Sequence, residues 1–324
     1  MDRCIGIFAV AVTVAVALEA SDAFAQSWPT RPLTLVVPFA AGGPSDVAGR
    51  IIAQRMSEVL GQQVVVDNPS GAGGTLGSSR VAKAVPDGYQ FVIGNIGTHA
   101  WSQSLYKKPP YDSVADFLPL SLVVESPRAV IAPAHFPANS LPEFVTYIKA
   151  NQANAKFGSA GAGSASHVSC ILLNAALNVS ITHVPYRGLG PAMQDLIAGR
   201  VDYMCDSPST SLPQVEANLV KAIATTGHQR SASLPKVPTA KEQGLNFEVN
   251  SWQGVCSFRE ALRFPLCGVS LRRSMRHWIH RRYASVSKAL ARTSFLPSEE
   301  VRNILRDSLR RKSRGGAARS RRVA

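Results

Sequence analysis

Residues 38–46 read Pro-Phe-Ala-Ala-Gly-Gly-Pro-Ser-Asp, and this stretch decides how the chain around it folds. The apolar run 33–37 before it predicts a strand, and the apolar positions of residues 47–60 recur near helical spacing. The two glycines let the backbone turn, and Ser45 and Asp46 are favoured N-cap residues. Such a junction presents free N–H groups that suit a carboxylate or phosphate, although an ordinary strand-to-helix turn explains it equally well.

The same pattern of strand, small-residue loop and helix recurs downstream. Residues 64–66 predict a strand that leads into the loop 67–74 and a helix over 75–84. Residues 91–94 predict a short buried strand that leads into the polar loop 95–99. This alternation is typical of a mostly parallel sheet flanked by helices, in which ligands collect at the carboxyl ends of the strands.

A second unit with the same logic begins near residue 128. Its central feature is the Gly/Ser-rich loop 158–167, which follows Phe157 and precedes a predicted helix over 168–177. Further strands are predicted at 129–132, 181–184, 201–205 and 220–224, and further helices at 141–151, 191–198 and 239–243. Two α/β units of this kind can face each other across a cleft and hold a small acidic molecule between their backbone N–H groups.

The N-terminus has the features of a secretory signal peptide. Arg3 precedes the apolar segment 5–18, and an Ala-Phe-Ala site ends at Ala25, after which we expect cleavage. An uncleaved membrane anchor fits less well, because the apolar segment is shorter than the roughly 20 residues that span a bilayer. We therefore expect an exported, periplasmic protein.

Charge is distributed very unevenly along the 324 residues. Residues 1–255 contain 17 Lys or Arg and 17 Asp or Glu, so the whole net charge of +14 lies in the Arg- and Ser-rich residues 256–324. We interpret this tail as the product of a frameshift, and the alternative is a genuine basic extension that binds nucleic acid or an anionic membrane. The sequence does not indicate how Cys170, Cys205, Cys256 and Cys267 would pair.

Eight segments, in a fixed order, carry a resemblance to a known family. They begin at residues 28–32 (Trp-Pro-Thr-Arg-Pro) and 37–46, and continue with 70–74 (Ser-Gly-Ala-Gly-Gly), 86–89 (Pro-Asp-Gly-Tyr), 106–112 (Tyr-Lys-Lys-Pro-Pro-Tyr-Asp), 157–167, 183–188 (His-Val-Pro-Tyr-Arg-Gly) and 234–239 (Leu-Pro-Lys-Val-Pro-Thr). From about Trp28 to Gly254 the chain resembles the extracytoplasmic receptors of tripartite tricarboxylate transporters, also called the Bug family. The tail after Gly254 departs from the family's pattern.

The resemblance implies a two-lobed periplasmic binding protein of the Venus-flytrap, type II-like fold. We expect lobe 1 to comprise residues 26–127, with about 226–255 returning to it, and lobe 2 to comprise 128–225. Such a receptor closes on a small carboxylate and delivers it to the permease subunits of the transporter. The expected protein is a monomer without cofactor, metal site, catalytic residue or nucleic-acid partner.

The family holds its carboxylate largely with backbone amides and small hydroxyls. Carried over to this chain, the expected ligand-binding residues are Phe39, Ala40, Gly42, Gly43, Ser45, Asp46, Thr98, Ser159, Ala160, Gly163, Ser164, His167 and Asp206. Thr98 and Asp206 are the weaker candidates.

Several of these residues have structural explanations as well. Ser159 and Ser164 are hydroxyl donors to the ligand or N-caps, and His167 either contacts the ligand or lies just inside the helix. For Asp46 we favour helix capping over a water-mediated ligand contact. His183 is expected to pack at a strand end.

A secreted α/β enzyme acting on a small acid is the alternative function. It receives little support, because the spacing around Ser164 is not G-x-S-x-G. The loops after Gly71 and Gly161 each lack the third glycine of a dinucleotide-binding motif.

Overall fold

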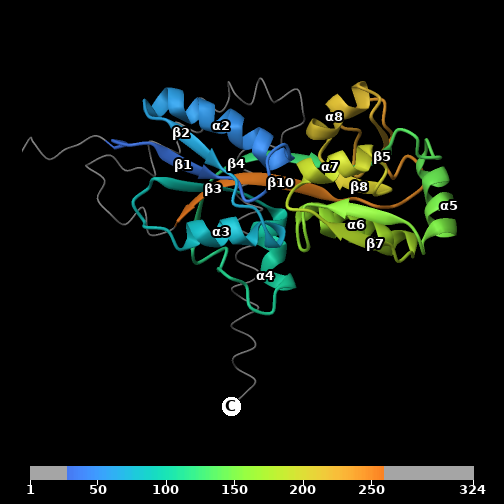
Figure 1. Ribbon diagram of the computed structural model, residues 1–324, viewed down its shortest axis with the longest axis horizontal. Coiled ribbons are helices and arrows are strands. Elements are labelled where there is room, and N and C mark those ends of the chain that lie inside the picture. Colours follow the sequence, from blue (N-terminus) through green and yellow to red (C-terminus); the bar gives the residue numbers. More distant parts are fainter. Residues whose placement is uncertain (1–27, 259–324) are drawn as a thin grey trace, which may run out of the picture.

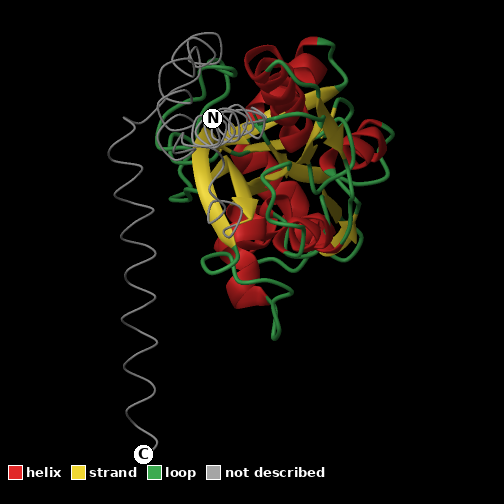
Figure 2. Ribbon diagram, turned by 90° about the vertical axis from the view of Figure 1, so that its left-hand side faces the viewer, coloured by secondary structure: helices red, strands yellow, loops and turns green. Residues whose placement is uncertain are grey.

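The structure, a computed structural model, describes residues 28–258 and contains two five-stranded sheets that lie end to end, each flanked by helices (Figure 1). Figure 2, viewed from the end of the first sheet, shows helices on both faces of the strands. We call each sheet with its helices a lobe. The predicted signal peptide and nearly all of the basic tail lie outside the described residues. Within 28–258 no helix is long and apolar enough to cross a membrane.

The first sheet has the strand order β2-β1-β3-β10-β4. Its strands are β1 (Leu33–Val36), β2 (Val64–Asp67), β3 (Gln90–Asn95), β4 (Phe117–Pro127) and β10 (Asn250–Phe258). The strands β2, β1 and β3 pair in parallel, as the sequence predicts, whereas β10 runs antiparallel to both β3 and β4. The 11-residue strand β4 was not predicted.

The second sheet has the order β7-β6-β8-β5-β9. Its strands are β5 (Ala129–Pro133), β6 (Lys156–Ser159), β7 (Thr182–Pro185), β8 (Tyr203–Asp206) and β9 (Val220–Thr225). The strands β7, β6 and β8 are parallel, and β5 pairs antiparallel with β8 and β9. The two-lobed α/β fold is therefore confirmed, with sheets that are mixed because one strand in each, β10 or β5, runs opposite to the other four.

Side chains that alternate along each strand bury both faces of the first sheet. Leu33 and Leu35 pack with Ala53 of α2 (Pro44–Leu60), whereas Val36 and Val92 face the opposite way and pack with Val81 of α3 (Thr75–Ala82). The short elements η2 (Ala72–Gly74), η3 (Gly97–Trp101) and α4 (Ser102–Leu105) complete this lobe.

The second lobe follows the same plan. Helices α5 (Leu141–Asn151) and α6 (Ala165–Leu177) supply side chains to the core on one face, and α7 (Leu189–Ile197) and α8 (Pro208–Glu216) supply them on the other. Helix α8 was not predicted from the sequence. Residues 239–243, where a helix was predicted, form an isolated bridge at Thr239 followed by turns.

The segment between β9 and β10 packs on the second lobe. Leu234, Ala240 and Phe247 lie in the apolar clusters of that lobe, and the chain pairs with the first sheet from Asn250, where β10 begins. These three side chains are each less than one tenth exposed, so apolar burial holds the segment there.

Thr226 links the two segments of chain that connect the lobes, one at Arg128 and the other at Val249. Its hydroxyl accepts a hydrogen bond from the Arg128 N–H (2.8 Å) and donates to the Val249 carbonyl (2.5 Å). The Arg128 carbonyl in turn accepts from the Thr226 N–H at 2.8 Å. One side chain thus links the two segments of chain that connect the lobes.

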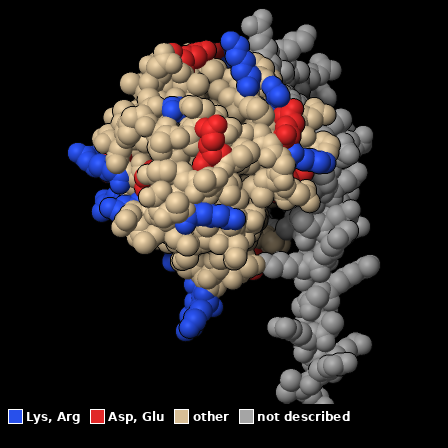
Figure 3. Space-filling view, turned by 90° about the vertical axis from the view of Figure 1, so that its right-hand side faces the viewer, with Lys and Arg blue, Asp and Glu red and all other residues tan. Residues whose placement is uncertain are grey.

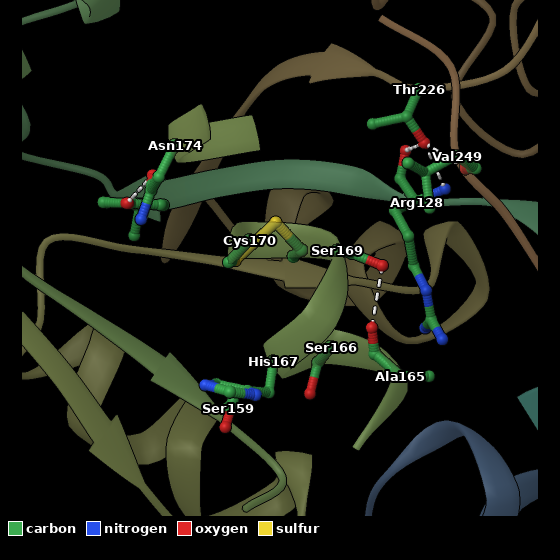
Figure 4. The surroundings of a disulfide bond; sticks show 12 residues. Arg128, Ser159, Ala165, Ser166, His167, Ser169, Cys170, Asn174, Thr226 and Val249 are labelled. Carbon is green, nitrogen blue, oxygen red and sulfur yellow. Dashed lines mark hydrogen bonds between the residues drawn. A yellow bond between two sulfur atoms is a disulfide. The ribbon is translucent and has the colours of Figure 1, made fainter. Parts of the chain in front are cut away.

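A disulfide joins Cys170 of α6 to Cys205 of β8 inside the second lobe (Figure 4). Both residues are fully buried, and the bond closes a loop with a sequence separation of 35. Cys256 is a free, buried thiol, and Cys267 lies outside the described residues. The disulfide fixes α6, which follows the Gly/Ser-rich loop, to the sheet below it.

We predict that reduction of this disulfide destabilises the protein by about 3–4 kcal/mol, because the bond restricts the unfolded chain over a 35-residue separation. Urea unfolding with and without a reductant measures the difference. A double variant, Cys170→Ala with Cys205→Ala, should be equally unstable under both conditions. An unchanged midpoint for the reduced wild-type protein would contradict the prediction.

Candidate functional site

The loop of residues 38–46 is organised by the Asp46 carboxylate. It accepts hydrogen bonds from the Gly42 N–H (3.0 Å), Arg50 Nε (2.9 Å) and Asn68 Nδ2 (3.1 Å). Burial alone raises the pKa of Asp46, but the hydrogen bonds from these three residues outweigh it and lower the pKa below its usual range.

Asp46 is not the N-cap of α2, contrary to the sequence-based expectation. The helix begins at Pro44, its N-cap is Gly43, and Ser45 and Asp46 lie in the first turn. Since Gly43 has no side chain, no hydroxyl or carboxylate occupies the end of the helix. Within residues 28–258, nothing accepts a hydrogen bond from the N–H groups of Ala41, Gly43 and Ser45.

The loop of residues 158–167 instead satisfies most of its own donors. Ser166 Oγ accepts from the Ala160 N–H (2.9 Å), Ser159 Oγ from the Gly161 N–H (3.1 Å) and His167 Nδ1 from the Gly163 N–H (3.2 Å). These bonds leave the N–H groups of Ala162, Ala165 and Ser166 without an acceptor in the described part of the chain.

The two serines of this loop have different roles. Ser164 is the N-cap of α6, and its hydroxyl accepts from the His167 N–H at 3.3 Å. Ser159 caps no helix, because it ends β6 and its hydroxyl lies 2.6 Å from His183 Nε2. Both hydroxyls are buried and engaged within the lobe.

His167 and His183 lie against each other beneath this loop, with ring centroids 4.1 Å apart. The His183 ring stacks on Phe157 at 4.9 Å, in agreement with its expected packing at a strand end. Burial, with His167 nearby, lowers the pKa of His183 to about 4, and burial also lowers the pKa of His167. Both rings are therefore mainly neutral at pH 7.

Thr98 and Asp206 lie inside their own lobes. Thr98 Oγ1 accepts from the Asn95 N–H (2.9 Å) and lies 2.8 Å from His99 Nδ1. Asp206 accepts from the Ser207 N–H (2.7 Å) and from the hydroxyls of two residues of α8. Both side chains are at most 1% exposed, so neither offers a free polar atom to a ligand in this conformation.

Where the lobes meet, backbone lies against backbone. The Ala40 N–H donates to the Arg187 carbonyl at 3.0 Å. A Cβ atom added to Gly190 would lie 2.2 Å from the Ala41 oxygen, and one added to Gly73 would lie 2.2 Å from the Ala162 oxygen. We call this contact region the seam: residues 40–43 meet 187–190, and residues 73 and 97 meet 161–165.

Phe39 connects the two halves of the seam. Its side chain is 5% exposed and lies in the same apolar cluster as Ala160 and Leu189 of the second lobe. A Cβ atom on Gly74 would lie 2.6 Å from the Phe39 ring, so the aromatic ring fills the space that this glycine leaves. Phe39 thus packs across the seam.

Gly73, Gly188 and Gly190 were not among the site residues predicted from the sequence. A signal for the last two was present, because the motif Gly-Leu-Gly-Pro at residues 188–191 leads into α7 much as Gly-Gly-Pro at 42–44 leads into α2. The signal for Gly73 was the small-residue loop 67–74, which is expected at the edge of the sheet where ligands collect, but nothing in the loop singles out this glycine.

Charged side chains are sparse on the end of the molecule formed by the second lobe (Figure 3). On that face, Lys and Arg are interspersed with Asp and Glu and form no continuous basic surface. In residues 28–258 there is also no group of three or more His, Cys, Asp or Glu placed to hold a metal ion.

Comparison with known proteins identifies relatives of most of the two-lobed region. A family model described as tripartite tricarboxylate transporter family receptor matches residues 48–260. A UPF0065 protein from Agrobacterium vitis is 43% identical over 231 residues, which are 71% of this chain and 66% of that protein. The match thus spans about two thirds of that relative's length.

Solved structures of related proteins share the fold. MatC from Rhodopseudomonas palustris, with bound malate, is 38% identical with a TM-score of 0.76, over 84% of this chain and 92% of MatC. The periplasmic binding protein BugD is 41% identical with a TM-score of 0.71, over 74% of this chain and 80% of BugD.

We predict that protonation of His183 destabilises the fold. Its pKa of about 4 lies below the ordinary value near 6.5, so the unfolded chain binds more protons between these values, and stability is lost as pH falls from 6.5 to 4. After allowance for solvent screening, we expect His183→Gln to reduce the loss of stability between pH 7 and pH 5 by about 1 kcal/mol.

Urea unfolding of both proteins at pH 5, 6, 7 and 8 measures this contribution. Glutamine can still hydrogen bond to Ser159, so the variant should fold, and the comparison at pH 8 gives the cost of the substitution itself. Parallel stability curves for the two proteins would contradict the prediction.

Proposed function

The chain belongs to the receptor family of tripartite tricarboxylate transporters, and from this premise we propose that it captures a small carboxylate at the seam between its lobes. The observation that carries the proposal is the set of free backbone N–H groups in the loops at the seam. The malate bound to MatC supports a carboxylate as the ligand.

Two helix N-termini contribute to this site. Gly43 and Ser45 offer N–H groups at the start of the 17-residue helix α2, and Ala165 and Ser166 offer them at the start of the 13-residue helix α6. Free N–H groups and the positive end of the helix dipole both favour an anion. No positively charged side chain is needed for one carboxylate to bind here.

The remaining predicted residues have supporting roles in this proposal. Asp46 and His167 use their side chains to hold the loop backbone, and Ser164 caps α6. Phe39 and Ala160 exclude water from the seam, and Thr98 and Asp206 stabilise the neighbouring loops from within. Recognition therefore depends mainly on the backbone.

Capture requires both lobes, because the two sets of donors lie on opposite sides of the seam. A ligand that contacts both sides favours the closed conformation by the difference in its affinity for the closed and open states. We further propose that the lobes comprise residues 28–127 with 250–258, and 128–249. The Thr226 hydrogen bonds mark the hinge between them.

The rest of the proposed role concerns location and delivery. We propose that the chain is exported by its signal peptide, works in the periplasm as BugD does, and passes its ligand to membrane permease subunits. The proposed role contains no catalytic step.

We predict that a small carboxylate raises the unfolding midpoint of the full chain, because a ligand that binds only the folded state stabilises it by about 2.7 kcal/mol at one hundred times its Kd. A thermal-shift panel of mono-, di- and tricarboxylates with four to six carbons identifies the ligand, and the corresponding amides are the matched controls. If circular dichroism shows a folded protein and no acid shifts its midpoint, the proposal fails.

We predict that Gly190→Ala weakens ligand binding about tenfold or more. Its added Cβ would collide with the Ala41 carbonyl across the closed seam, and overpacking of this kind costs about 1–3 kcal/mol. The open conformation relieves the collision, so the stability without ligand should change little. Isothermal titration calorimetry and urea unfolding separate the two effects.

Gly61→Ala is the control for a glycine substitution as such. Gly61 has a φ of 65° and no neighbour within 4 Å of an added Cβ atom, so this variant should lose some stability and keep its affinity. Equal affinities for Gly190→Ala and the wild type would show that binding does not need the seam as described.

A further inference from the structure

Arg128 lies at the point where the chain first passes from one lobe to the other. It occupies the single position between β4 and β5, and its neighbour Ala129 pairs with both Asp206 and Thr225. The residue is only 5% exposed. An arginine is rarely buried to this extent without partners, because removing its charge from water is costly.

The guanidinium group of Arg128 lacks hydrogen-bond acceptors. It has five N–H donors, and its one side-chain hydrogen bond to the described residues runs from Nη2 to Ser251 Oγ at 2.7 Å. The Nε atom is buried and has no partner in residues 28–258. A buried donor without an acceptor costs free energy that an oxygen acceptor recovers.

The charge of Arg128 is also incompletely balanced. Asp206 is near enough to favour the charged form, but it forms no ion pair with Arg128 within 4.0 Å. The Asp206 oxygens are already used by Ser207, Thr210 and Ser211. Burial lowers the pKa of Arg128 to about 10, which leaves it protonated at neutral pH.

The Arg128 side chain points toward the ligand-binding side of α6. In Figure 4 it extends away from Thr226 and Val249 in the direction of Ala165, the first residue of that helix. The Ala165 N–H group has no acceptor in the described chain, and an added Cβ atom on Gly97 of the first lobe would lie 2.6 Å from the Ala165 nitrogen. A buried cation and a helix N-terminus therefore converge near the seam.

We propose that Arg128 binds a second anionic group of the ligand, so that this receptor selects dicarboxylates over monocarboxylates of the same length. The inference rests on the proposed capture of a carboxylate at the seam. The backbone N–H groups hold one carboxylate. The unpaired N–H groups of the Arg128 guanidinium donate hydrogen bonds to the other. Arginine suits this role because its planar donors match the two oxygens of a carboxylate.

The position of Arg128 also links ligand binding to the hinge. Its backbone is hydrogen-bonded to Thr226, and its side chain to Ser251 of β10 in the first sheet. A carboxylate bound to Arg128 therefore adds to the hydrogen bonds that Arg128 makes with Thr226 and Ser251, and so is linked through Arg128 to both segments that connect the lobes. A monocarboxylate lacks this link.

The test compares acids that differ in one carboxylate: succinate with butyrate, glutarate with pentanoate, and adipate with hexanoate. Isothermal titration calorimetry on the full chain identifies the pair that binds most tightly, and the wild type should prefer the dicarboxylate about 10- to 100-fold. Arg128→Gln should remove this preference by weakening the dicarboxylate and leaving the monocarboxylate within about threefold. Arg128→Lys, which keeps the charge but not the planar donors, should retain part of it.

Arg200→Gln is the matched control for the loss of one positive charge. The Arg200 side chain is 71% exposed and paired with Asp195 on the surface of the second lobe, so this variant should keep the wild-type preference. A preference lost equally in both variants would indicate a general charge effect and would overturn the assignment to Arg128.

A second measurement needs no glutamine variant. In the wild-type protein, the NMR signal of the buried Arg128 Nε–H, assigned by its loss in Arg128→Lys, should shift when the dicarboxylate is added and stay in place with the monocarboxylate. An unmoved signal, or an unchanged preference in Arg128→Gln, overturns this inference. If the wild type binds neither acid of any pair, it is the proposed capture of a carboxylate that fails.

Discussion

Close contact between backbones at the seam is the constraint on which the rest of the structure depends. Two of its glycines, Gly73 and Gly190, leave no room for a Cβ atom, because peptide oxygens of the opposite lobe lie 2.2 Å from where it would stand. At these positions backbone meets backbone, which brings peptide N–H groups and helix ends close to whatever lies between the lobes. This geometry explains why the loops are built from glycine, alanine and serine, and why an anion suits them better than a neutral or basic molecule.

The two lobes differ in how many backbone N–H groups their loops leave free for an anion. In the first lobe, Asp46 takes up the Gly42 N–H and leaves its neighbours free, so the loop 38–46 is the more available set of donors. In the second lobe, the side chains of Ser159, Ser166 and His167 accept hydrogen bonds from three of the loop's backbone N–H groups. The Cys170–Cys205 disulfide fixes the helix α6 that follows the loop. The loop of the second lobe is thus held by more internal contacts than the loop of the first.

Local sequence patterns predicted the parallel strands, the principal helices and the loops that begin α2 and α6, because period, glycine and capping signals are properties of short segments. They did not predict β4, whose mixed burial gives no clear alternation, or the antiparallel position of β10, which depends on pairing between distant residues. Gly43 rather than Asp46 is the N-cap of α2, and the Asp46 carboxylate instead accepts a hydrogen bond from Asn68, 22 residues away, a contact that local sequence patterns do not show. Arg128 marked only the start of a new unit in the sequence, since its lack of acceptors is a tertiary property.

The position of β10 has a consequence for the order of folding. The sheet of the second lobe is built from one continuous stretch that begins at β5, so it can assemble from segments that are neighbours in the chain. The first lobe begins earlier in the chain, but its sheet stays divided until β10 enters between β3 and β4. Contacts so distant in sequence close slowly. The lobe that comes first in the chain is therefore completed last, and until then the backbone groups at the edges of β3 and β4 pair with water or with other segments.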